Sequence, residues 1–439
     1  MGCLTWKYQV LCVLSLLFLH SPSSLSSLLS SNSQCSALLQ FNNSLSLESS
    51  ACRPVIYSFN SFNRSVSNVQ SKNKKSCETS YPKTASWKED KHCCSWDGVE
   101  CDKNTGHVIG LDLSYSRLKG AIDSNSTLFL LRHLRTLNLA GNDFYPSLLS
   151  SEFGQFKSLT HLNLSCSHFT GQIPSEISQL SSLVSLDLSH SYGLSIETPV
   201  WNNLTLLREL HLDQTNMSSI RPKSLMNLSS SLTTLSLRAC FLWGKLEISI
   251  LLLPSLQTLD LGTNPSLNIS LPKSNWSSTS LKFLDLSVTR FSGEIPDSIG
   301  NLKSLKYLDL SNCEFSGPIP TTLGNLTQII DLSLSWNRFT GSIPSSLGNL
   351  TQITDMSLSW NRFTGSIPTS LGNLTQITDM NLSENNFTGS IPSSFENLTQ
   401  LTHLDLSRNK FSGVIPACLD NLTKLTFLSL SFNSFNGEI

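Results

Sequence analysis

From Leu281 to the end of this 439-residue chain, one phrase of sequence recurs every 24 residues. Its pattern is L-x-x-L-x-L-x-x-N-x-F-x-G-x-I-P, and less regular copies reach back to Val108, which makes about fourteen repeats. A unit of this size cannot bury its apolar face alone, so neighbouring units must stack and share one core. The repeat therefore predicts an elongated solenoid. The regular copies open at Leu281, Leu305, Ile329, Ile353, Ile377, Leu401 and Leu425.

Within each unit, the apolar spacing predicts a short strand followed by a turn. In the copy that opens at Ile329, Leu332 and Leu334 flank Ser333, which is the alternation of a half-buried strand. A period of 24 residues with this leucine spacing is typical of leucine-rich repeats. We therefore expect an α/β-type repeat solenoid with one inner parallel strand per repeat.

Other positions of the phrase predict how units are joined. The asparagine side-chain amide should form hydrogen bonds with the backbone of the turns above and below it, so that the asparagines of successive repeats form a ladder. Some repeats have Ser, Thr or Cys at this position, and each of these side chains can donate one hydrogen bond. The phenylalanines should stack as a buried spine, the glycine allows positive φ, and Ile-Pro forces an extended return on the outer side. The ladder positions include Asn142, Asn264, Asn337, Asn361, Asn385, Asn409 and Asn433, and the spine positions include Phe291, Phe315, Phe339, Phe363, Phe387, Phe411 and Phe435.

The N-terminus has the pattern of a secretory signal. Lys7 precedes an apolar run from Val10 to Leu19, and Ser-rich sequence follows. This run is too short for a membrane span, which takes about 20 residues of helix, and a short apolar run behind a positive charge is typical of a signal peptide. We assign residues 1–33 to the signal region, with cleavage between about residues 23 and 33 and an uncleaved anchor as the alternative. No later run is long enough for a membrane span.

Charge and cysteine content narrow the possible functions. The net charge is −1 and only 14% of residues are charged, so no electrostatic footprint for nucleic acid is present. Cys35 and the five cysteines from Cys52 to Cys101 crowd ahead of the repeats. Behind a secretory signal, this crowding predicts a disulfide-stapled cap over residues 34–107, followed by repeats over 108–439. A zinc site would need two C-x-x-C or histidine-bearing pairs, and the segment has none.

Sequons of the form N-x-S/T are a second secretory marker, and the chain has sixteen. Several belong to a repeated G-N-L-T phrase whose stacked neighbours would crowd one another, so we expect glycan on a subset. The candidates are Asn42, Asn63, Asn125, Asn203, Asn227, Asn268, Asn325, Asn349, Asn373, Asn397 and Asn421.

Four segments of the cap and first repeat carry a family resemblance. They are Ser36–Phe41, Ser86–Lys88, Cys93–Asp102 and Gly106–Ser114. Together with the G-x-I-P that closes each unit, they closely resemble plant receptor-like proteins, which have an extracellular leucine-rich-repeat domain and no kinase. The resemblance implies a right-handed superhelix, a peptide or protein ligand, a receptor kinase as co-receptor and a role in immune or developmental signalling, of which we expect defence.

The same resemblance implies the cysteine pairing. It joins Cys94 to Cys101 and Cys93 to Cys35, which leaves Cys52 and Cys77 to pair, and permuted connectivities stay open. Cys240 and Cys313 occupy the asparagine position of their repeats and are expected to be buried thiols.

The family pattern continues with further repeats, a C-terminal cysteine cap and a membrane helix, whereas this chain stops inside a repeat at Ile439. We therefore expect a fragment or a truncated product. The full-length protein would be a single-pass protein of the plasma membrane with extracellular repeats, and a truncated one would be secreted.

Outward side chains between the leucines predict a binding face on the concave side, because tryptophan and arginine dominate interface hot spots. Alternatively, the copies at Ile329 and Ile353 differ at only three positions, so their Trp and Arg pairs can reflect duplication alone. A glycan on Asn163 or Asn381 would stand on the same face. The candidates are Asp331, Trp336, Arg338, Asp355, Trp360, Arg362, Asp379, His403 and Arg408, and Glu384 and Phe432 continue the tryptophan column.

Three readings of function compete. The first is a receptor ectodomain, and the second is a secreted inhibitor of a cell-wall-degrading enzyme that resembles the polygalacturonase inhibitors, which have a shorter array. The third is a truncated product without function. We do not expect an enzyme, a cofactor or a metal, because the histidines are isolated, no Ser/His/Asp set or phosphate loop appears, and the strand aspartates should face solvent.

Overall fold

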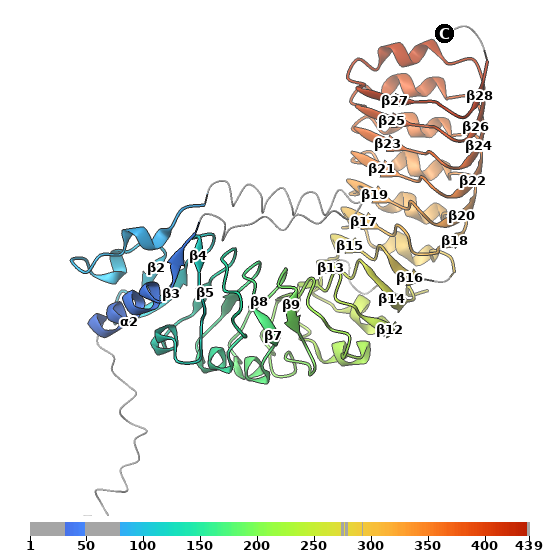
Figure 1. Ribbon diagram of the computed structural model, residues 1–439. Coiled ribbons are helices and arrows are strands. Elements are labelled where there is room, and N and C mark those ends of the chain that lie inside the picture. Colours follow the sequence, from blue (N-terminus) through green and yellow to red (C-terminus); the bar gives the residue numbers. More distant parts are fainter. Residues whose placement is uncertain (1–30, 49–79, 274–275, 277–279, 292, 437–439) are drawn as a thin grey trace, which may run out of the picture.

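The computed structural model describes residues 31–48, 80–273, 276, 280–291 and 293–436. Residues 1–30 of the expected signal region, together with Cys52, Cys77 and Asn63, lie outside these ranges. The repeats form a curved stack of coils, so the expected solenoid is confirmed (Figure 1). Within the described ranges, no helix combines the length and apolar character that a membrane span requires.

One long sheet of fifteen strands lines the inner side of the coils. Its first strand, β2, pairs antiparallel with β3 and covers the open edge of the stack. The other strands pair in parallel, for example Leu332 with Met356. The strands are β2 (Val99–Cys101), β3 (Val108–Asp112), β5 (Thr136–Asn138), β6 (His161–Asn163), β8 (Ser185–Asp187), β10 (Glu209–His211), β11 (Thr234–Ser236), β13 (Thr258–Asp260), β15 (Phe283–Asp285), β17 (Tyr307–Asp309), β19 (Asp331–Ser333), β21 (Asp355–Ser357), β23 (Asp379–Asn381), β25 (His403–Asp405) and β27 (Phe427–Ser429).

A second set of parallel strands, which the sequence pattern did not predict, lies beside the inner sheet. Figure 1 shows the two sets as separate columns in the C-terminal coils. Six strands form the longest of these sheets: β18 (Ser316–Gly317), β20 (Arg338–Gly341), β22 (Arg362–Gly365), β24 (Asn386–Gly389), β26 (Lys410–Gly413) and β28 (Ser434–Phe435). Shorter ones are formed by β7 (Thr170–Gln172) with β9 (Gly193–Ser195), and by β12 (Trp243–Lys245), β14 (Asn264–Ile269) and β16 (Thr289–Phe291).

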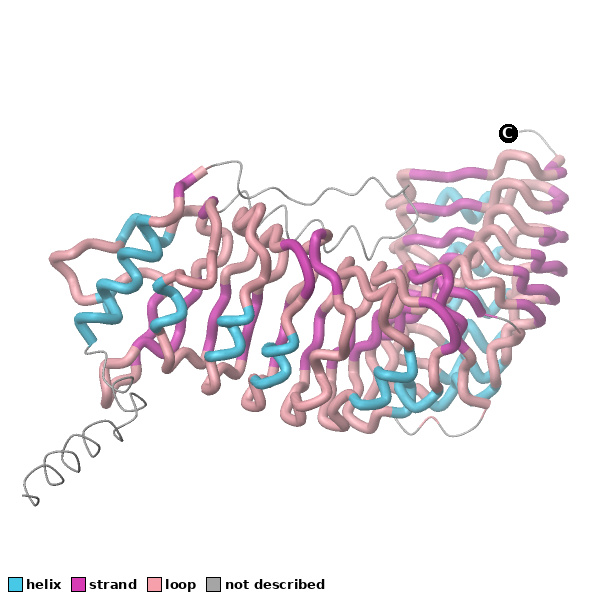
Figure 2. The backbone as a smooth tube through the Cα atoms, turned by 60° about the horizontal axis from the view of Figure 1, so that its bottom comes forward, coloured by secondary structure: helices cyan, strands magenta, loops and turns pink. Residues whose placement is uncertain are grey.

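Short 3-10 turns complete the coils on the outer side, where Figure 2 shows them in cyan. Each regular turn follows an Ile-Pro pair, and Pro344 has the expected extended backbone with φ −69° and ψ 137°. The turns that follow an Ile-Pro pair are η7 (Ser175–Gln179), η10 (Asp297–Asn301), η11 (Thr321–Asn325), η12 (Ser345–Asn349), η13 (Thr369–Asn373), η14 (Ser393–Asn397) and η15 (Ala417–Asn421). The less regular coils contribute η6 (Ser151–Gln155), η8 (Pro222–Asn227) and η9 (Ile248–Leu252), which no Ile-Pro pair precedes.

Leucines and phenylalanines of successive coils form one continuous core. Leu332 and Leu334 are at most 1% exposed, and the spine from Phe315 to Phe411 is fully buried. From Phe315 to Phe435, rings of adjacent coils stack with centroids 5.8 to 6.2 Å apart. Burying one such side chain contributes about 1.5–3 kcal/mol. The predicted spine is therefore present in the C-terminal coils, where it joins each coil to the next.

The asparagine ladder is also present, with an irregularity. The Asn337 amide donates to three backbone carbonyls at 2.8 to 3.1 Å and accepts from the backbone N–H groups of Cys313 and Phe315. In contrast, the buried hydroxyls of Ser191 and Thr215 have no hydrogen-bond partner. The expectation that every small replacement donates a bond is wrong at these two positions.

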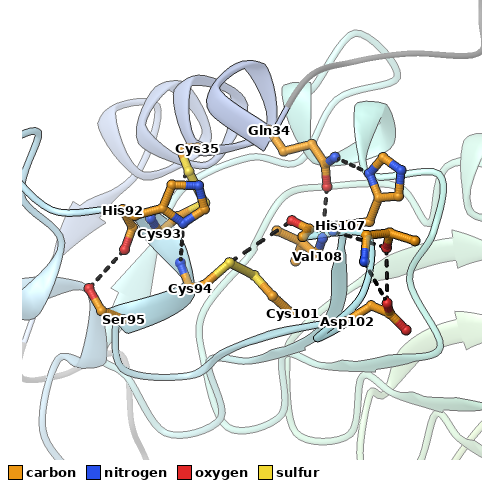
Figure 3. Close-up of a disulfide and its surroundings, with 12 residues drawn as sticks. Gln34, Cys35, His92, Cys93, Cys94, Ser95, Cys101, Asp102, His107 and Val108 are labelled. Atoms are coloured by element: carbon orange, nitrogen blue, oxygen red, sulfur yellow. Dashed lines mark hydrogen bonds between the residues drawn. A yellow bond between two sulfur atoms is a disulfide. The ribbon is translucent and has the colours of Figure 1, made fainter.

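The N-terminal cap is fastened to the first coils by α2 (Ser31–Asn43). Figure 3 shows Gln34 of α2 beside His107, with its Oε1 accepting from the Val108 N–H at 2.8 Å. Disulfides join Cys35 to Cys93 and Cys94 to Cys101, the two pairings that the resemblance implied. The remaining elements are β1 (Ser46–Leu47), which pairs with β4 (Leu118–Lys119), and the turns η3 (Lys83–Ser86), η4 (Cys93–Ser95) and η5 (Thr127–Leu130).

Candidate functional site

The first residues of the inner strands from β15 to β27 form one column on the inner face, called here the first column. Its members are cross-strand partners, so neighbouring backbones lie about 4.8 Å apart. Three half-buried carboxylates occupy the middle, and a stacked ring pair closes each end, with centroids 4.2 and 4.1 Å apart. The column consists of Phe283, Tyr307, Asp331, Asp355, Asp379, His403 and Phe427.

A floor of hydroxyl groups follows the carboxylates along the strands. The Ser333 and Ser335 hydroxyl oxygens lie 3.3 Å apart, and those of Ser357 and Ser359 lie 3.2 Å apart. Ser333 and Ser357 are half-buried, and the other two are buried. The floor therefore offers hydrogen-bonding groups without adding charge.

A second column, called here the turn column, stands where the chain leaves the inner strands β19 to β27. Its residues have φ between 54° and 56°, a left-handed conformation that is uncommon outside glycine. The first two rings stack at 4.0 Å with an interplanar angle of 9°, yet they remain 37% and 41% exposed. The column consists of Trp336, Trp360, Glu384, Arg408 and Phe432.

The polar members of the turn column satisfy one another. Arg408 Nε lies 3.0 Å from Glu384 Oε1 in an ion pair, and the same guanidinium lies 4.6 Å from the centre of the Phe432 ring. These contacts hold the charges of Glu384 and Arg408 against each other. The exposed rings of Trp336 and Trp360 lie against each other, whereas the exposed ring of Phe432 lies against Arg408.

Arg338 and Arg362 do not lie over the inner strands, where we expected them. They are the first residues of β20 and β22, in the second sheet, because the left-handed turn at the tryptophans redirects the chain. Both are exposed, and Arg338 Nη2 lies 3.7 Å from Glu314 Oε2. Lys410 has the same position in β26 and is also exposed. We call Arg338, Arg362 and Lys410 the basic rim.

A buried charge cluster precedes this face and corrects the expectation that strand aspartates face solvent. Asp285 and Asp309 are 0% and 2% exposed. Arg238 reaches over the next coil to the one after it, with Nη1 3.5 Å from Asp260 Oδ1 and 2.6 Å from Asp285 Oδ2. Gly262 leaves room for it, since a Cβ there would lie 2.5 Å from that nitrogen. Burial, and secondly the charge of Asp285, raise the pKa of Asp309 to about 7.

The candidate sequons occupy two kinds of position. Asn42 is half-buried in α2, and the other described candidates are exposed. Two further sequons lie in inner strands, at Asn163 and Asn381, and Asn381 Oδ1 accepts from the Ser383 N–H and hydroxyl at 3.1 and 2.7 Å. The exposed candidates are Asn125, Asn203, Asn227 and Asn268, with Asn325, Asn349, Asn373, Asn397 and Asn421 each ending a 3-10 turn.

Sequence reasoning missed the aromatic ends of the first column and the buried cluster. Phe283, Tyr307 and Phe427 could have been found by following the Asp331 position at steps of 24 residues in both directions. Arg238 gave no such signal, because its partners stand at a different position of the repeat.

Comparisons with known proteins agree with this architecture. A model of a leucine-rich repeat region matches residues 246–382, and leucine-rich-repeat models match 375–435, 158–180 and 131–144. Receptor-like protein 6 of Arabidopsis thaliana is 44% identical over 233 residues, which is 51% of this chain and 23% of that protein. Receptor-like protein Cf-9 of Solanum pimpinellifolium is 42% identical over 228 residues, 51% of this chain and 26% of that protein. The matched region thus spans about a quarter of these relatives.

Solved structures share the fold. The structure of PEPR1 with AtPEP1 is 28% identical, with a TM-score of 0.66 and coverage of 92% of this chain and 56% of that chain. The plant peptide hormone receptor RGFR1 in complex with RGF2 is 26% identical, with a TM-score of 0.63 and coverage of 79% and 65%. The repeat phrase, the capped solenoid and the named relatives lead to one conclusion. This chain is a leucine-rich-repeat protein that is similar to the receptor-like proteins of plants over about half of its length.

Proposed function

We propose that this chain is the ligand-recognition ectodomain of a plant cell-surface receptor and that the inner face from β19 to β27 holds a peptide or protein ligand. The observation that carries the proposal is the exposed stack of Trp336 on Trp360, beside a row of carboxylates. Tryptophan is among the residues that dominate binding hot spots. Rings already held against each other also lose little freedom when a ligand binds.

The similar structures support a peptide ligand by analogy of fold. PEPR1 was solved with AtPEP1, and RGFR1 with RGF2. In this proposal the chain has no catalytic role of its own. It lies on the extracellular side of the plasma membrane and passes the binding signal to a receptor kinase that acts as co-receptor, in defence.

A glycan placed on the inner face tests the proposed site. The substitution Asp355→Asn creates the sequon Asn-Met-Ser, because Ser357 follows two residues later. The matched control Lys303→Thr creates Asn-Leu-Thr at Asn301, the exposed last residue of η10 on the outer side. Mass spectrometry establishes that both new sequons carry glycan in the secreted variants.

The probe is a set of peptides selected on the wild-type chain from a random library displayed on phage. We expect the inner glycan to abolish their binding and the outer glycan to leave it unchanged. The double variant Trp336→Ala/Trp360→Ala should weaken binding by at least about tenfold, since one hot-spot side chain contributes about 2 kcal/mol. Undiminished binding to the glycosylated inner variant would exclude this face as the ligand site.

A further inference from the structure

Opposite charges border the exposed tryptophan pair. The carboxylates of Asp331, Asp355 and Asp379 stand on one side of it, and the basic rim of the second sheet stands on the other. Like charges opposite one another in neighbouring strands destabilise a sheet. Three carboxylates at cross-strand positions therefore place negative charge side by side on this face, which a ligand of opposite charge complements.

The carboxylate row is one coil longer than the tryptophan pair. Residues 365–380 repeat residues 341–356 with one difference, and this copy ends just after Asp379. The same coil has Glu384 and Asn386 where the preceding coil has Trp360 and Arg362. The carboxylate therefore continues into a coil that lacks both the tryptophan and the arginine.

The spacing of the row matches an extended peptide that runs along the stack. With coils about 4.8 Å apart, the three carboxylates cover about 10 Å. In an extended peptide, successive side chains point to opposite edges, and residues i and i+2 lie on one edge about 6.7 Å apart. Two basic side chains at i and i+2 therefore both reach the row, and the residue between them points towards Trp336 and Trp360.

We propose that the ligand presents an extended basic–apolar–basic triplet to the inner face. This inference rests on the proposed function and names the chemistry of its ligand. The two basic side chains lie against Asp331, Asp355 and Asp379, and the apolar one packs on the tryptophan pair. The basic rim repels a peptide turned the other way, so the charge pattern sets which edge of the ligand faces which column. The serine hydroxyls of the floor bond the peptide backbone.

The experiment selects a random peptide library on the full secreted chain at low and at high salt. We expect basic–apolar–basic triplets to be enriched about fivefold over the same residues in the order basic–basic–apolar. One or two exposed ion pairs provide an affinity ratio of about this size. The enrichment should fall at high salt, because salt screens exposed charges. The order-swapped motif has the same net charge, so it separates geometry from simple attraction.

A triple variant and its matched control complete the test. Asp331→Ala/Asp355→Ala/Asp379→Ala should lose the triplet preference. Alanine is used because asparagine would create sequons at the first two positions. The control Asp123→Ala/Asp297→Ala/Asp420→Ala removes three exposed carboxylates outside the inner sheet and should keep the preference. Unchanged thermal midpoints establish that both variants are folded.

The outcomes separate the two proposals. Enrichment of acidic, uncharged or order-swapped motifs, or selection of no peptide, would overturn the triplet. The same holds if the triple variant keeps the preference or the control loses it. If other selected peptides are still displaced by the inner glycan, the face remains the ligand site and only the triplet fails. If the inner glycan displaces nothing, the proposed function itself fails.

Discussion

The guanidinium of Arg238 donates to the carboxylate of Asp285 across two strand intervals of the inner sheet, with 2.6 Å between Nη1 and Oδ2. Asp285 is fully buried, and Arg238 also lies 3.5 Å from Asp260. A pair of this depth stabilises mainly because losing one member leaves the other charge buried and unpaired. The cluster is therefore the part of the inner sheet most sensitive to a single substitution.

Arg238→Ala should lower the free energy of unfolding by about 3–5 kcal/mol, because several buried carboxylates lose their shared cation. Urea unfolding followed by tryptophan fluorescence measures the change. Arg338→Ala is the control, since this exposed arginine lies 3.7 Å from Glu314 and should cost less than about 1 kcal/mol. Equal losses in the two variants would contradict the role given to Arg238.

The same cluster should make stability depend on pH. Burial raises the pKa of Asp309 to about 7, and burial also raises the pKa of Asp260. An aspartate in the unfolded chain titrates near 3.9. Between about pH 4 and 7 the folded chain therefore binds more protons than the unfolded chain, and the contribution of Asp309 to the free energy of unfolding falls as pH rises.

Thermal midpoints measured across that range test this sign. The wild-type midpoint should fall more steeply with rising pH than that of Asp309→Ala, and the two curves should run parallel below about pH 4. A variant that keeps the wild-type slope would show that another group causes the dependence.

Much of the fold could be predicted because only a few arrangements of the repeats let neighbouring units share one apolar core. The leucine alternation around Ser333 and the phenylalanine at position 339 each require burial, and stacking at a fixed period provides it. The second sheet could not be predicted in this way. Arg338–Gly341 has no strand alternation of its own, and it pairs because neighbouring coils stack at a fixed period, which places Thr340 opposite Arg362 of the next coil.

The candidate face could be predicted only in part. The tryptophan pair followed from the repeat, whereas its stacking depends on a left-handed backbone at Trp336 that side-chain pattern does not encode. Arg338 was displaced to the rim for the same reason. Asp285 was expected to face solvent because the alternation of the strand places its side chain outward. In the structure the long side chain of Arg238, from another coil, covers it.

The contribution of the asparagine ladder to the free energy of unfolding should differ from one coil to another. Asn337→Ala leaves the buried N–H groups of Cys313 and Phe315 without their acceptor and should cost about 1–3 kcal/mol. Ser191→Ala is the matched control, because the Ser191 hydroxyl is buried without a partner and its removal should be neutral within about 0.5 kcal/mol. Urea midpoints measure both, and a similar cost at the two positions would contradict this account of the ladder.

Crowding should limit glycosylation along the outer column of sequons. Asn325, Asn349 and Asn373 end consecutive 3-10 turns that pack against one another. A branched glycan is far wider than the roughly 5 Å between coils, so neighbouring sites compete for space. Asn349→Gln should therefore raise glycan occupancy at Asn325 and Asn373, as measured on glycopeptides by mass spectrometry.

Asn421 lies three coils from Asn349 and is the internal control, because removing the glycan of Asn349 cannot relieve crowding at that distance. Full occupancy of all these sites in the wild-type chain would show that the glycans splay apart and do not exclude one another.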